Sequence, residues 1–548
     1  PNTFWLDFYA RFNAFCLGLG YEQDIVCDPA AVEKLRQVVR ENPSMLLWTH
    51  KTYLDGMVVP KVLYDNDFPM PHMFGGANMN FPGLGFLLHR AGAIFIKRSF
   101  QDNELYKITL RHYIGYLMEK RFPMNWAFEG TRSRMGKLMP PRYGLLKYVL
   151  EACHATDATN IHIIPISISY DLIRDVEEYA TEQTGRGKGA ESLRWFIGYI
   201  RSLARPMGKV YMDIGEPVVL AEAPQPDDKL ALSKIAFEVA VEANHVTPIT
   251  FPSLVTMSLL GASPGALTED EVVRELDVLL AWAEARQLRI SQDFDRAYAD
   301  QMEGLLGIMI DEGMVTRYDE GPDVVYAIEQ EQHAVASYYR NTIIHFFVNK
   351  AIIELALLKT SETEGAGALE VFWSEVDKLR DLFKFEFFYA PTDVFHEQIR
   401  EELARYAPNW EELLQQGAPG FLQLQTNMLL LVSHATLLTY AEAYSIVAEL
   451  LAGMESSEPL TEEQCVTRSL KLGHQAYLQR RISSPASIGK LLFKNGFKMA
   501  EHRKLTMGGG EDVAEARQAL AREIRDVLRR LELIRALGVS IRGTLMEK

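Results

Sequence analysis

The strongest constraint on the fold is an alternation of two hydrophobic patterns from residue 29 to about residue 220. Short apolar runs typical of buried strands alternate with longer segments whose apolar residues recur at helical spacing. The apolar runs cover residues 45–48, 73–75, 93–96, 124–128, 161–169 and 210–214, and the helical segments cover residues 30–41, 102–120, 144–155, 190–203 and 228–242. This alternation predicts an α/β domain in which helices flank a mixed sheet.

The pattern changes at Thr247-Pro248-Ile249-Thr250-Phe251-Pro252, where paired prolines end the preceding helix. From Ser253 onward almost only helical periodicity remains, with glycine-containing turns at residues 261–265, 365–367, 417–420 and 508–510. We therefore predict three parts. They are an N-terminal amphipathic helical segment (residues 1–28), the α/β domain (residues 29–247) and a mostly α-helical C-terminal domain (residues 248–548).

Composition limits the classes of function. Hydrophobic residues make up 48% of the 548 residues, which is ample for a large core, and the net charge of -16 argues against a general nucleic-acid binder. The four cysteines are widely scattered at Cys16, Cys27, Cys153 and Cys465. No pair has the spacing of metal ligands, so we expect no metal site and a reduced, cytosolic setting.

No segment offers the roughly 20 uninterrupted apolar residues of a membrane-spanning helix. Residues 343–358 and 428–441 come closest, and their polar residues favour buried core helices. Residues 3–19 place aromatic side chains on one helical face, which either docks on the core or lies in a lipid interface. That face comprises Trp5, Phe8, Tyr9, Phe12, Phe15, Cys16 and Leu19. The chain begins at Pro1, so we expect the natural N-terminus to be missing and assign no targeting signal.

A histidine and an aspartate follow the apolar run that ends at Trp48. His50 can accept a proton near neutral pH, and the carboxylate of Asp55 on its other ring nitrogen would fix the tautomer. Positions five apart in a helix lie roughly 140° apart, so the pair requires His50 before a helix and Asp55 in its first turn. The alternative is a surface histidine and an aspartate favoured by the helix dipole.

Two further strand ends carry cations. Lys97 and Arg98 follow the run Ile94-Phe95-Ile96 and could bind an anion, or they could be a solvated strand end. Phe128-Glu129-Gly130-Thr131-Arg132-Ser133-Arg134 combines a glycine with two arginines that could grip one phosphate. In that loop Glu129 could orient an arginine or a substrate hydroxyl. A plain surface charge cluster is the alternative.

A proline interrupts the run Ile163-Ile164-Pro165-Ile166-Ser167. Because proline cannot donate to a strand ladder, we expect a bulge or an edge strand there. Pro165 then either shapes the wall of a cleft or belongs to a simple core strand.

These four blocks, in this order, resemble the four motifs of the glycerolipid acyltransferases. Among them, the chain is similar to the bacterial and mitochondrial glycerol-3-phosphate acyltransferases and to dihydroxyacetone-phosphate acyltransferase. Similar C-terminal stretches are residues 246–250, 337–341 and 385–388. Lys97 stands where many members have arginine. Thr131 stands where some bacterial members have glycine, which brings this loop closer to the mitochondrial and dihydroxyacetone-phosphate types.

The resemblance implies a role for each motif residue. His50 would be the general base toward the glycerol 1-hydroxyl and Asp55 would hold its imidazole. Lys97, Arg98, Arg132 and Arg134 would hold the phosphate. Glu129 and Gly130, beside Thr131, would position the glycerol, and Pro165 would line the acyl side.

The resemblance also implies the reaction and its setting. An acyl group would pass from acyl-CoA or acyl carrier protein to the sn-1 hydroxyl of glycerol 3-phosphate, with no cofactor. Such substrates require contact with a membrane surface, so we expect peripheral attachment to the cytoplasmic face of the cell membrane. Two alternatives are a dihydroxyacetone-phosphate acyltransferase and an inactive membrane-associated scaffold. The intact His50, Asp55 and arginine set disfavours the scaffold.

Overall fold

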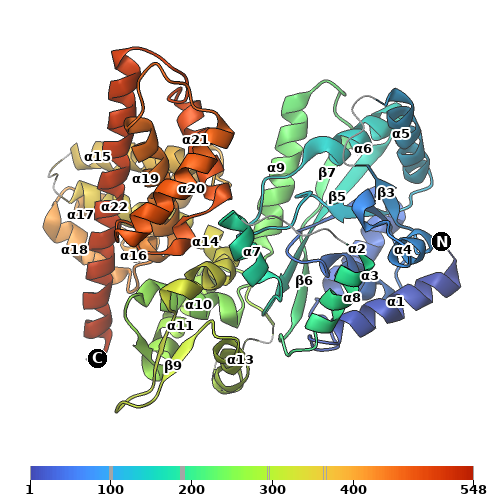
Figure 1. The fold of residues 1–548 in the computed structure, drawn as a ribbon, viewed down its shortest axis with the longest axis horizontal. Helices are drawn as coiled ribbons and strands as arrows, with labels where there is room; N and C mark the ends of the chain where they lie inside the picture. Colours follow the sequence, from blue (N-terminus) through green and yellow to red (C-terminus); the bar gives the residue numbers. More distant parts are fainter. Residues whose placement is uncertain are drawn as a thin grey trace. The chain divides into compact units, whose positions relative to one another are not determined.

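The computed structural model describes residues 2–97, 103–185, 192–292, 294, 297–361, 363, 365 and 367–546. The chain forms two compact units (Figure 1). The first comprises Pro1–Val176, Lys188–Pro252 and Arg286–Ile308, and the second comprises Glu177–Gly187, Ser253–Ala285 and Met309–Lys548. The first is an α/β unit and the second is mostly helical, so the predicted fold class is confirmed.

A seven-stranded mixed sheet forms the centre of the first unit. Its strands are β1 (Ser44–Trp48), β2 (His72–Gly76), β3 (Ile94–Ile96), β4 (Met124–Ala127), β5 (Thr159–Tyr170), β6 (Val210–Ile214) and β7 (Val218–Glu222). The order is β3-β2-β4-β1-β5-β6, and β7 also pairs with β5. The first five strands run parallel, whereas β6 and β7 are antiparallel to β5. All six strands predicted from the sequence are present, and β7 is additional.

Helices cover both faces of this sheet (Figure 1). They are α1 (Thr3–Leu17), α2 (Pro29–Glu41), α3 (Asp55–Asp65), α4 (Leu84–Arg90), α5 (Glu104–Glu119), α6 (Tyr143–Ala155), α8 (Leu193–Ser202) and α9 (Lys229–His245). Polar side chains fix several helix starts: Asp28, Asn103, Ser192 and Asp228 each accept a hydrogen bond from a first-turn N–H. Burial on both faces explains why β1 reads as one continuous apolar run, with Met45 and Leu46 fully buried.

The order of the strands determines where a site can form. From β1 the chain moves through α3 to β2 on one side, and from β4 it moves through α6 to β5 on the other. Right-handed crossovers therefore place α3 and α6 on opposite faces. Accordingly α1 packs on α3 and α4, while α6 packs on α5 and α9. The crevice beyond the carboxyl ends of neighbouring β1 and β4 is the usual ligand site of such a sheet.

Pro165 lies inside the sheet, so the edge-strand prediction is wrong. It pairs in parallel register with Leu47 of β1. On the other side of β5, β7 pairs as far as Ile163 and β6 begins at Ile166. Pro165 thus lies where the strand that pairs with this side of β5 changes from β7 to β6. At this position the missing N–H of proline leaves the hydrogen bonds between the strands intact. Its carbonyl accepts a hydrogen bond from the Gly215 N–H at 2.9 Å.

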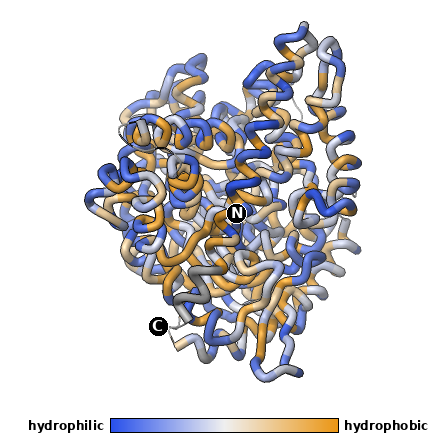
Figure 2. The backbone as a smooth tube through the Cα atoms, turned by 90° about the vertical axis from the view of Figure 1, so that its left-hand side faces the viewer, coloured by the Kyte–Doolittle hydropathy of each residue, from blue (hydrophilic) through white to orange (hydrophobic). Residues whose placement is uncertain are grey.

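The second unit is built around two long helices, α14 (His333–Thr360) and α19 (Ser433–Ala452), which pack on each other. Around them lie α7 (Val176–Gln183), α10 (Phe251–Ala262), α11 (Glu269–Glu284), α15 (Gly367–Phe383), α16 (Thr392–Tyr406), α17 (Trp410–Leu414), α18 (Ala418–Asn427), α20 (Glu462–Leu478), α21 (Lys490–His502) and α22 (Glu511–Met546). The helices alternate hydrophobic and hydrophilic positions (Figure 2). A small antiparallel sheet of β8 (Leu267–Thr268), β10 (Val325–Ala327) and β9 (Thr316–Tyr318) was not predicted.

In the described part of the chain, one helix, Gln330–Thr360, is long and apolar enough to cross a membrane. However, 72% of its apolar window is buried inside the protein, as predicted for a core helix. It also carries a buried carboxylate, Glu354, which accepts hydrogen bonds from the N–H groups of Val432 and Ser433 at 3.0 and 2.7 Å. Glu354 thereby satisfies donors at the start of α19 that the helix itself leaves unpaired.

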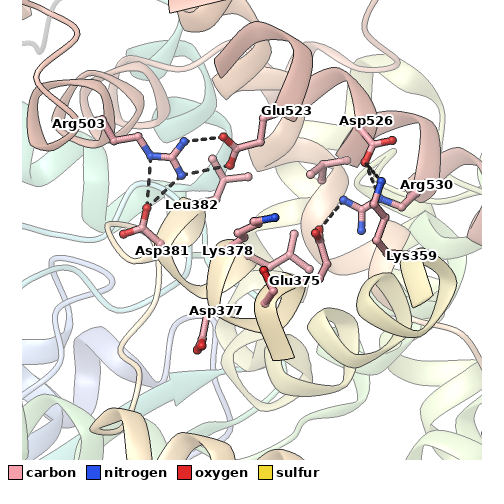
Figure 3. A pocket seen from close by; sticks show the side chains of 13 residues that line it. Lys359, Glu375, Asp377, Lys378, Asp381, Leu382, Arg503, Glu523, Asp526 and Arg530 are labelled. Atoms are coloured by element: carbon pink, nitrogen blue, oxygen red, sulfur yellow. Dashed lines mark hydrogen bonds and ion pairs between the residues drawn. The ribbon is translucent and has the colours of Figure 1, made fainter. Parts of the chain in front are cut away.

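A pocket of about 700 Å³ in this unit is lined largely by ion-paired side chains (Figure 3). Arg503 lies between Asp381 and Glu523, at 3.0 and 2.7 Å. Arg530 donates to Glu375 at 2.6 Å and also pairs with Asp526. The arginines therefore join α15 to α22 and to the residue that follows α21.

Candidate active site

The loop between β1 and α3 brings His50 and Asp55 together. β1 ends at Trp48 and α3 begins at Asp55, so the placement required by the sequence argument is confirmed. Nδ1 of His50 lies 2.9 Å from Oδ2 of Asp55. The same oxygen accepts hydrogen bonds from the N–H groups of Lys51 at 2.6 Å and Thr52 at 2.9 Å. Backbone donors thus fix the carboxylate independently of the histidine.

This arrangement sets the tautomer of His50. Because Nδ1 faces a carboxylate, it carries the hydrogen, and Nε2 is left with the lone pair. In the described part of the chain, Nε2 makes no hydrogen bond. The side chain of His50 is 22% exposed, whereas that of Asp55 is fully buried. A half-buried imidazole with an oriented lone pair is what a general base requires.

Glu129 joins the loop after β4 to the loop after β1. Its carboxyl group accepts hydrogen bonds from the N–H of His50 at 2.6 Å and from the N–H of Met139 at 2.8 Å. In return, the His50 carbonyl accepts from the Ser133 N–H at 2.7 Å. Burial raises the pKa of Glu129 to about 8. Glu129 therefore holds the backbone of His50.

Gly130 makes the tight turn of this second loop. Its φ of +68° is a conformation that favours glycine, and an added Cβ would lie 2.6 Å from Cγ of Arg142. Thr131 follows as an exposed residue. The glycine therefore allows Glu129 to point inward while the chain turns back toward Arg132.

Arg132 packs directly against the histidine-containing loop. Its guanidinium carbon lies 3.5 Å from the ring centre of Tyr53, and Nη2 donates to the Tyr53 hydroxyl at 2.7 Å. The Tyr53 ring in turn lies 4.5 Å from that of Trp195. Arg134 instead donates back to the Arg132 carbonyl at 2.5 Å. Arg132 is thus fixed beside the His50–Asp55 turn.

The remaining predicted cations lie farther along the sheet edge. Lys97 is exposed at the end of β3, and its ammonium group lies 5.7 Å from the Tyr106 ring. β3 is three positions from β1 in the sheet, which corresponds to about 14 Å at the usual strand spacing. Arg98 lies outside the described residues. The structure therefore joins His50, Asp55, Glu129 and Arg132 in one network, and it does not join Lys97 to them.

Three contributors to this network were not singled out from the sequence as site residues: Lys51, Tyr53 and Tyr170. Burial lowers the pKa of Lys51 to about 8, and its ammonium group donates to Oγ of Ser169 at 2.9 Å. The Tyr170 hydroxyl donates to Oδ1 of Asp55 at 2.6 Å. A polar residue at the end of an apolar strand was the available signal for Tyr170, which closes the run Ile166-Ser167-Ile168-Ser169.

The candidate active site and the pocket of the second unit differ in the hydrogen-bond donors that bind their carboxylates. The pocket's carboxylates are bound largely by arginines, whereas Asp55 and Glu129 are bound by backbone N–H groups and a hydroxyl. In the described part of the chain, no three histidine, cysteine, aspartate or glutamate side chains gather as metal ligands. The oriented imidazole of His50 beside the fixed guanidinium of Arg132 supports proton transfer next to a cation.

Comparisons with known proteins identify the family of this chain. Residues 30–169 match the family described as acyltransferase, and residues 179–508 match the family described as glycerol-3-phosphate acyltransferase C-terminal region. Proteins named "Putative acyltransferase plsB1" from Mycobacterium bovis and Mycobacterium tuberculosis are 34% identical over 524 residues. The alignment covers 94% of this chain and 84% of theirs.

Two more distant similarities were found. A glycerol-3-phosphate acyltransferase of Pseudomonas paraeruginosa is 25% identical, over 85% of this chain and 57% of the relative. The crystal structure of the 1-acyl-sn-glycerophosphate acyltransferase PlsC from Thermotoga maritima is 18% identical. It covers 44% of this chain and 78% of its own, with a TM-score of 0.27.

The fold and the two family matches define the class as an acyltransferase of the glycerolipid acyltransferase superfamily, with an α/β unit and a helical C-terminal region. Within that class, the chain belongs to the glycerol-3-phosphate acyltransferase family.

Proposed function

We propose that this protein transfers a fatty acyl group from acyl-CoA or acyl carrier protein to the sn-1 hydroxyl of glycerol 3-phosphate. The product is 1-acylglycerol 3-phosphate, the first intermediate of phospholipid synthesis. The observation that carries the proposal is the His50–Asp55 pair, with its 2.9 Å contact and the lone pair of Nε2 left for a substrate proton. Family membership supplies the class of reaction.

The mechanism follows from the geometry of the site. Nε2 of His50 takes the proton of the glycerol hydroxyl while the hydroxyl oxygen attacks the thioester carbonyl carbon. A C–O bond forms and the carbonyl becomes an oxyanion. When this intermediate collapses, the C–S bond breaks and the thiolate sulfur receives the proton from the imidazolium. A thioester is already activated, so this route uses only substrate orientation and general-base catalysis, and requires no cofactor.

The remaining predicted residues bind the acceptor in this proposal. Arg132 binds the phosphate, because its planar fork is fixed against Tyr53 beside the base. Arg134 and Lys97 add positive charge along the same sheet edge, and the family resemblance assigns Arg98, the next residue in the sequence, to the phosphate with them. Glu129 and Gly130 position the glycerol indirectly, by holding the His50 loop, and Thr131 stands exposed beside them. Pro165 lies deeper in the sheet, on the acyl side.

Purified protein incubated with radiolabelled glycerol 3-phosphate or dihydroxyacetone phosphate, against each donor, tests the proposal. We expect labelled 1-acylglycerol 3-phosphate from wild-type protein and almost none from His50→Ala. Preferred labelling of dihydroxyacetone phosphate would support the second candidate activity, which the loop containing Thr131 favours. No transfer to either acceptor with any donor would support the scaffold alternative.

We also propose peripheral attachment to the cytoplasmic face of the membrane through α1. The structure corrects which face of this helix is buried: Tyr9, Asn13 and Cys16 point inward. Phe4, Phe8 and Phe15 are 65%, 48% and 61% exposed. An exposed aromatic stripe is the feature that interfacial helices insert among lipid headgroups.

Replacing the three exposed phenylalanines of α1 by serine tests this attachment while leaving the buried face intact. We expect weaker flotation with anionic liposomes. The matched control replaces three exposed leucines of the second unit, Leu422, Leu429 and Leu478, which are 56%, 48% and 82% exposed. Equal flotation of both variants and the wild type would contradict a lipid role for α1.

A further inference from the structure

Tyr170 contacts the oxygen of Asp55 that does not face the histidine. Its hydroxyl donates to Oδ1 at 2.6 Å, while Oδ2 takes the hydrogen bonds from His50, Lys51 and Thr52. Tyr170 is 4% exposed and Asp55 is fully buried. The tyrosine therefore bonds the buried side of the carboxylate.

The position of Tyr170 is fixed by the strand that carries it. The β5 backbone next to it is tied to the β1 loop, because the Ile168 N–H donates to Oγ1 of Thr49 at 2.9 Å. The Tyr170 ring lies 5.4 Å from that of Tyr21, whose hydroxyl donates to the Leu172 carbonyl at 2.9 Å. Burial and the adjacent Asp55 raise the pKa of Tyr170 well above its ordinary value, so its hydroxyl remains a hydrogen donor.

We propose that Tyr170 is a positioning residue of the acyl-transfer reaction, which holds the Asp55 carboxylate toward His50 and thereby sets the basicity of that histidine. This inference rests on the proposed function, because it assigns to Tyr170 a role that acts through the base. The hydroxyl does two things. It fixes the rotation of the carboxylate plane, and it takes up part of the negative charge that would otherwise stabilise the imidazolium.

Other titratable groups surround this chain of contacts. Lys51 and Glu129 face Asp55 from its own loop and from the loop after β4, and Asp213 acts on Lys51 from β6. Tyr21 and Tyr199 face Tyr170. None of them changes in Tyr170→Phe, which removes a single oxygen atom. Any difference in activity between this variant and the wild type is therefore caused by the loss of the Tyr170 hydroxyl.

Removing the hydroxyl leaves Oδ1 buried without its donor. More of the negative charge then interacts with the imidazolium, so the pKa of His50 rises and less free base is present at neutral pH. We expect the acidic limb of the kcat/KM profile to move to higher pH by about 0.5–1 unit and turnover near pH 7 to fall about 3–10-fold, because a shift of one unit changes the fraction of free base at most tenfold.

The matched control is Tyr211→Phe. Tyr211 is also a buried strand tyrosine whose hydroxyl donates to a carboxylate, that of Asp171 at 3.0 Å, and Asp171 makes no described contact with His50. We expect its profile to match the wild type. A Tyr170→Phe profile that overlays both would overturn the inference.

The protonation of His50 is also measurable without turnover. The rate of its modification by diethyl pyrocarbonate against pH, identified by difference from His50→Gln, gives its pKa. We expect a higher pKa in Tyr170→Phe and a lower one with 3-fluorotyrosine at position 170, a stronger donor. No shift in either protein would overturn the inference. If the wild type transfers no acyl group but the shifts are seen, the proposed function fails and the Tyr170–Asp55–His50 linkage stands.

A double substitution separates positioning from a general structural effect. In an Asp55→Asn background, Tyr170→Phe should lower turnover less than twofold further, because its effect passes through the carboxylate. If Tyr170→Phe causes the same loss in both backgrounds, the hydroxyl does not act through Asp55 and the inference is wrong.

Discussion

The pocket of the second unit and the candidate active site of the first unit hold carboxylates in opposite ways. In the second unit, Glu375 and Glu523 are bound by the guanidinium groups of Arg530 and Arg503 (Figure 3). In the first unit, Asp55 and Glu129 are bound chiefly by backbone N–H groups, at 2.6 to 2.9 Å. The pocket therefore pairs its carboxylates with arginines, whereas the active site fixes them to the main chain.

This difference separates a structural network from a reactive one. A carboxylate neutralised by an arginine has little effect on a third group, and its main consequence is to join the helices that carry the two partners. Main-chain donors instead fix the direction of the Asp55 carboxylate, which points at an imidazole. The contrast predicts which substitutions affect turnover and which affect only stability.

Asp55→Asn should have the largest effect on turnover. An amide cannot stabilise the imidazolium, so we expect kcat to fall about 10²–10⁴-fold, the range that general-base catalysis supplies. Asp171→Asn is the control, because Asp171 is an equally buried carboxylate bound by the Lys209 N–H and the Tyr211 hydroxyl. We expect it to lower thermal stability and leave kcat within about twofold. Equal losses of kcat in both variants would show that the effect is not specific to the carboxylate that faces His50.

Arg132 tests the cation beside the base. Arg132→Ala should lower kcat/KM for glycerol 3-phosphate about 10–100-fold, because a hydrogen bond to a charged group contributes about 1.5–3 kcal/mol. The KM for the acyl donor should change little. Arg132→Lys, which keeps the charge and loses the planar fork, should recover part of the loss. An unchanged KM for the acceptor in Arg132→Ala would exclude a phosphate contact.

The titration of Glu129, a residue of the site, should make the folding stability of the protein depend on pH. Its folded-state pKa is about 8, against about 4.3 unfolded, so the folded chain holds an extra proton between these values. Folding stability from this group is therefore present below about pH 4.3 and lost as pH rises toward 8.

The variant Glu129→Gln, compared by calorimetry with wild type, tests this sign. Glutamine can accept one of the two backbone hydrogen bonds, so we expect the variant to be less stable at pH 5 by roughly 1–3 kcal/mol. The deficit should shrink between pH 5 and 7, a range that lies about one unit or more below the pKa of Lys51. A stability deficit that grows over this range would show that folding lowers the pKa of Glu129 and does not raise it. Turnover should fall less than about tenfold, because the histidine side chain itself keeps its contacts.

Arg530→Met should affect stability alone. Removing one partner of a buried ion pair costs about 3–5 kcal/mol, and Arg530 has a side chain only 3% exposed. We expect a lower melting temperature and unchanged kcat per folded molecule. Lys359→Met, whose partner Asp526 is half-exposed, should cost at most about 1 kcal/mol. A large change in kcat for either variant would show that the pocket participates in catalysis.

The strands of the α/β unit could be predicted because burial on both faces leaves a continuous apolar run in the sequence. β1, predicted at residues 45–48 and found at Ser44–Trp48, is an example. The strands β8, β9 and β10 are two or three residues long, too short to show a periodicity, and they were missed. In α1 the aromatic spacing predicted a helix and not its buried face, since Asn13 lies inward and Phe15 outward.

The candidate site, like the fold, has features that the sequence predicts and features that it does not. His50, Asp55 and Arg132 could be found because each follows the end of a strand, and parallel strands end at one edge of a sheet. The contacts of Tyr170 and Lys51 could not be predicted, because they depend on the register between β1 and β5. In that register Trp48 pairs with Ile166. The sequence gives no measure of register between strands more than 100 residues apart.

The most direct test is acyl transfer to radiolabelled glycerol 3-phosphate by the wild type, His50→Gln and His162→Gln. His162 is a histidine on β5, away from the carboxyl edge of the sheet, whose Nδ1 contacts the Asn160 carbonyl. The wild type and His162→Gln should form 1-acylglycerol 3-phosphate at equal rates, with His50→Gln slower by about 10²–10⁴-fold. Wild-type rates from a correctly folded His50→Gln protein would contradict the assignment of His50 as the base.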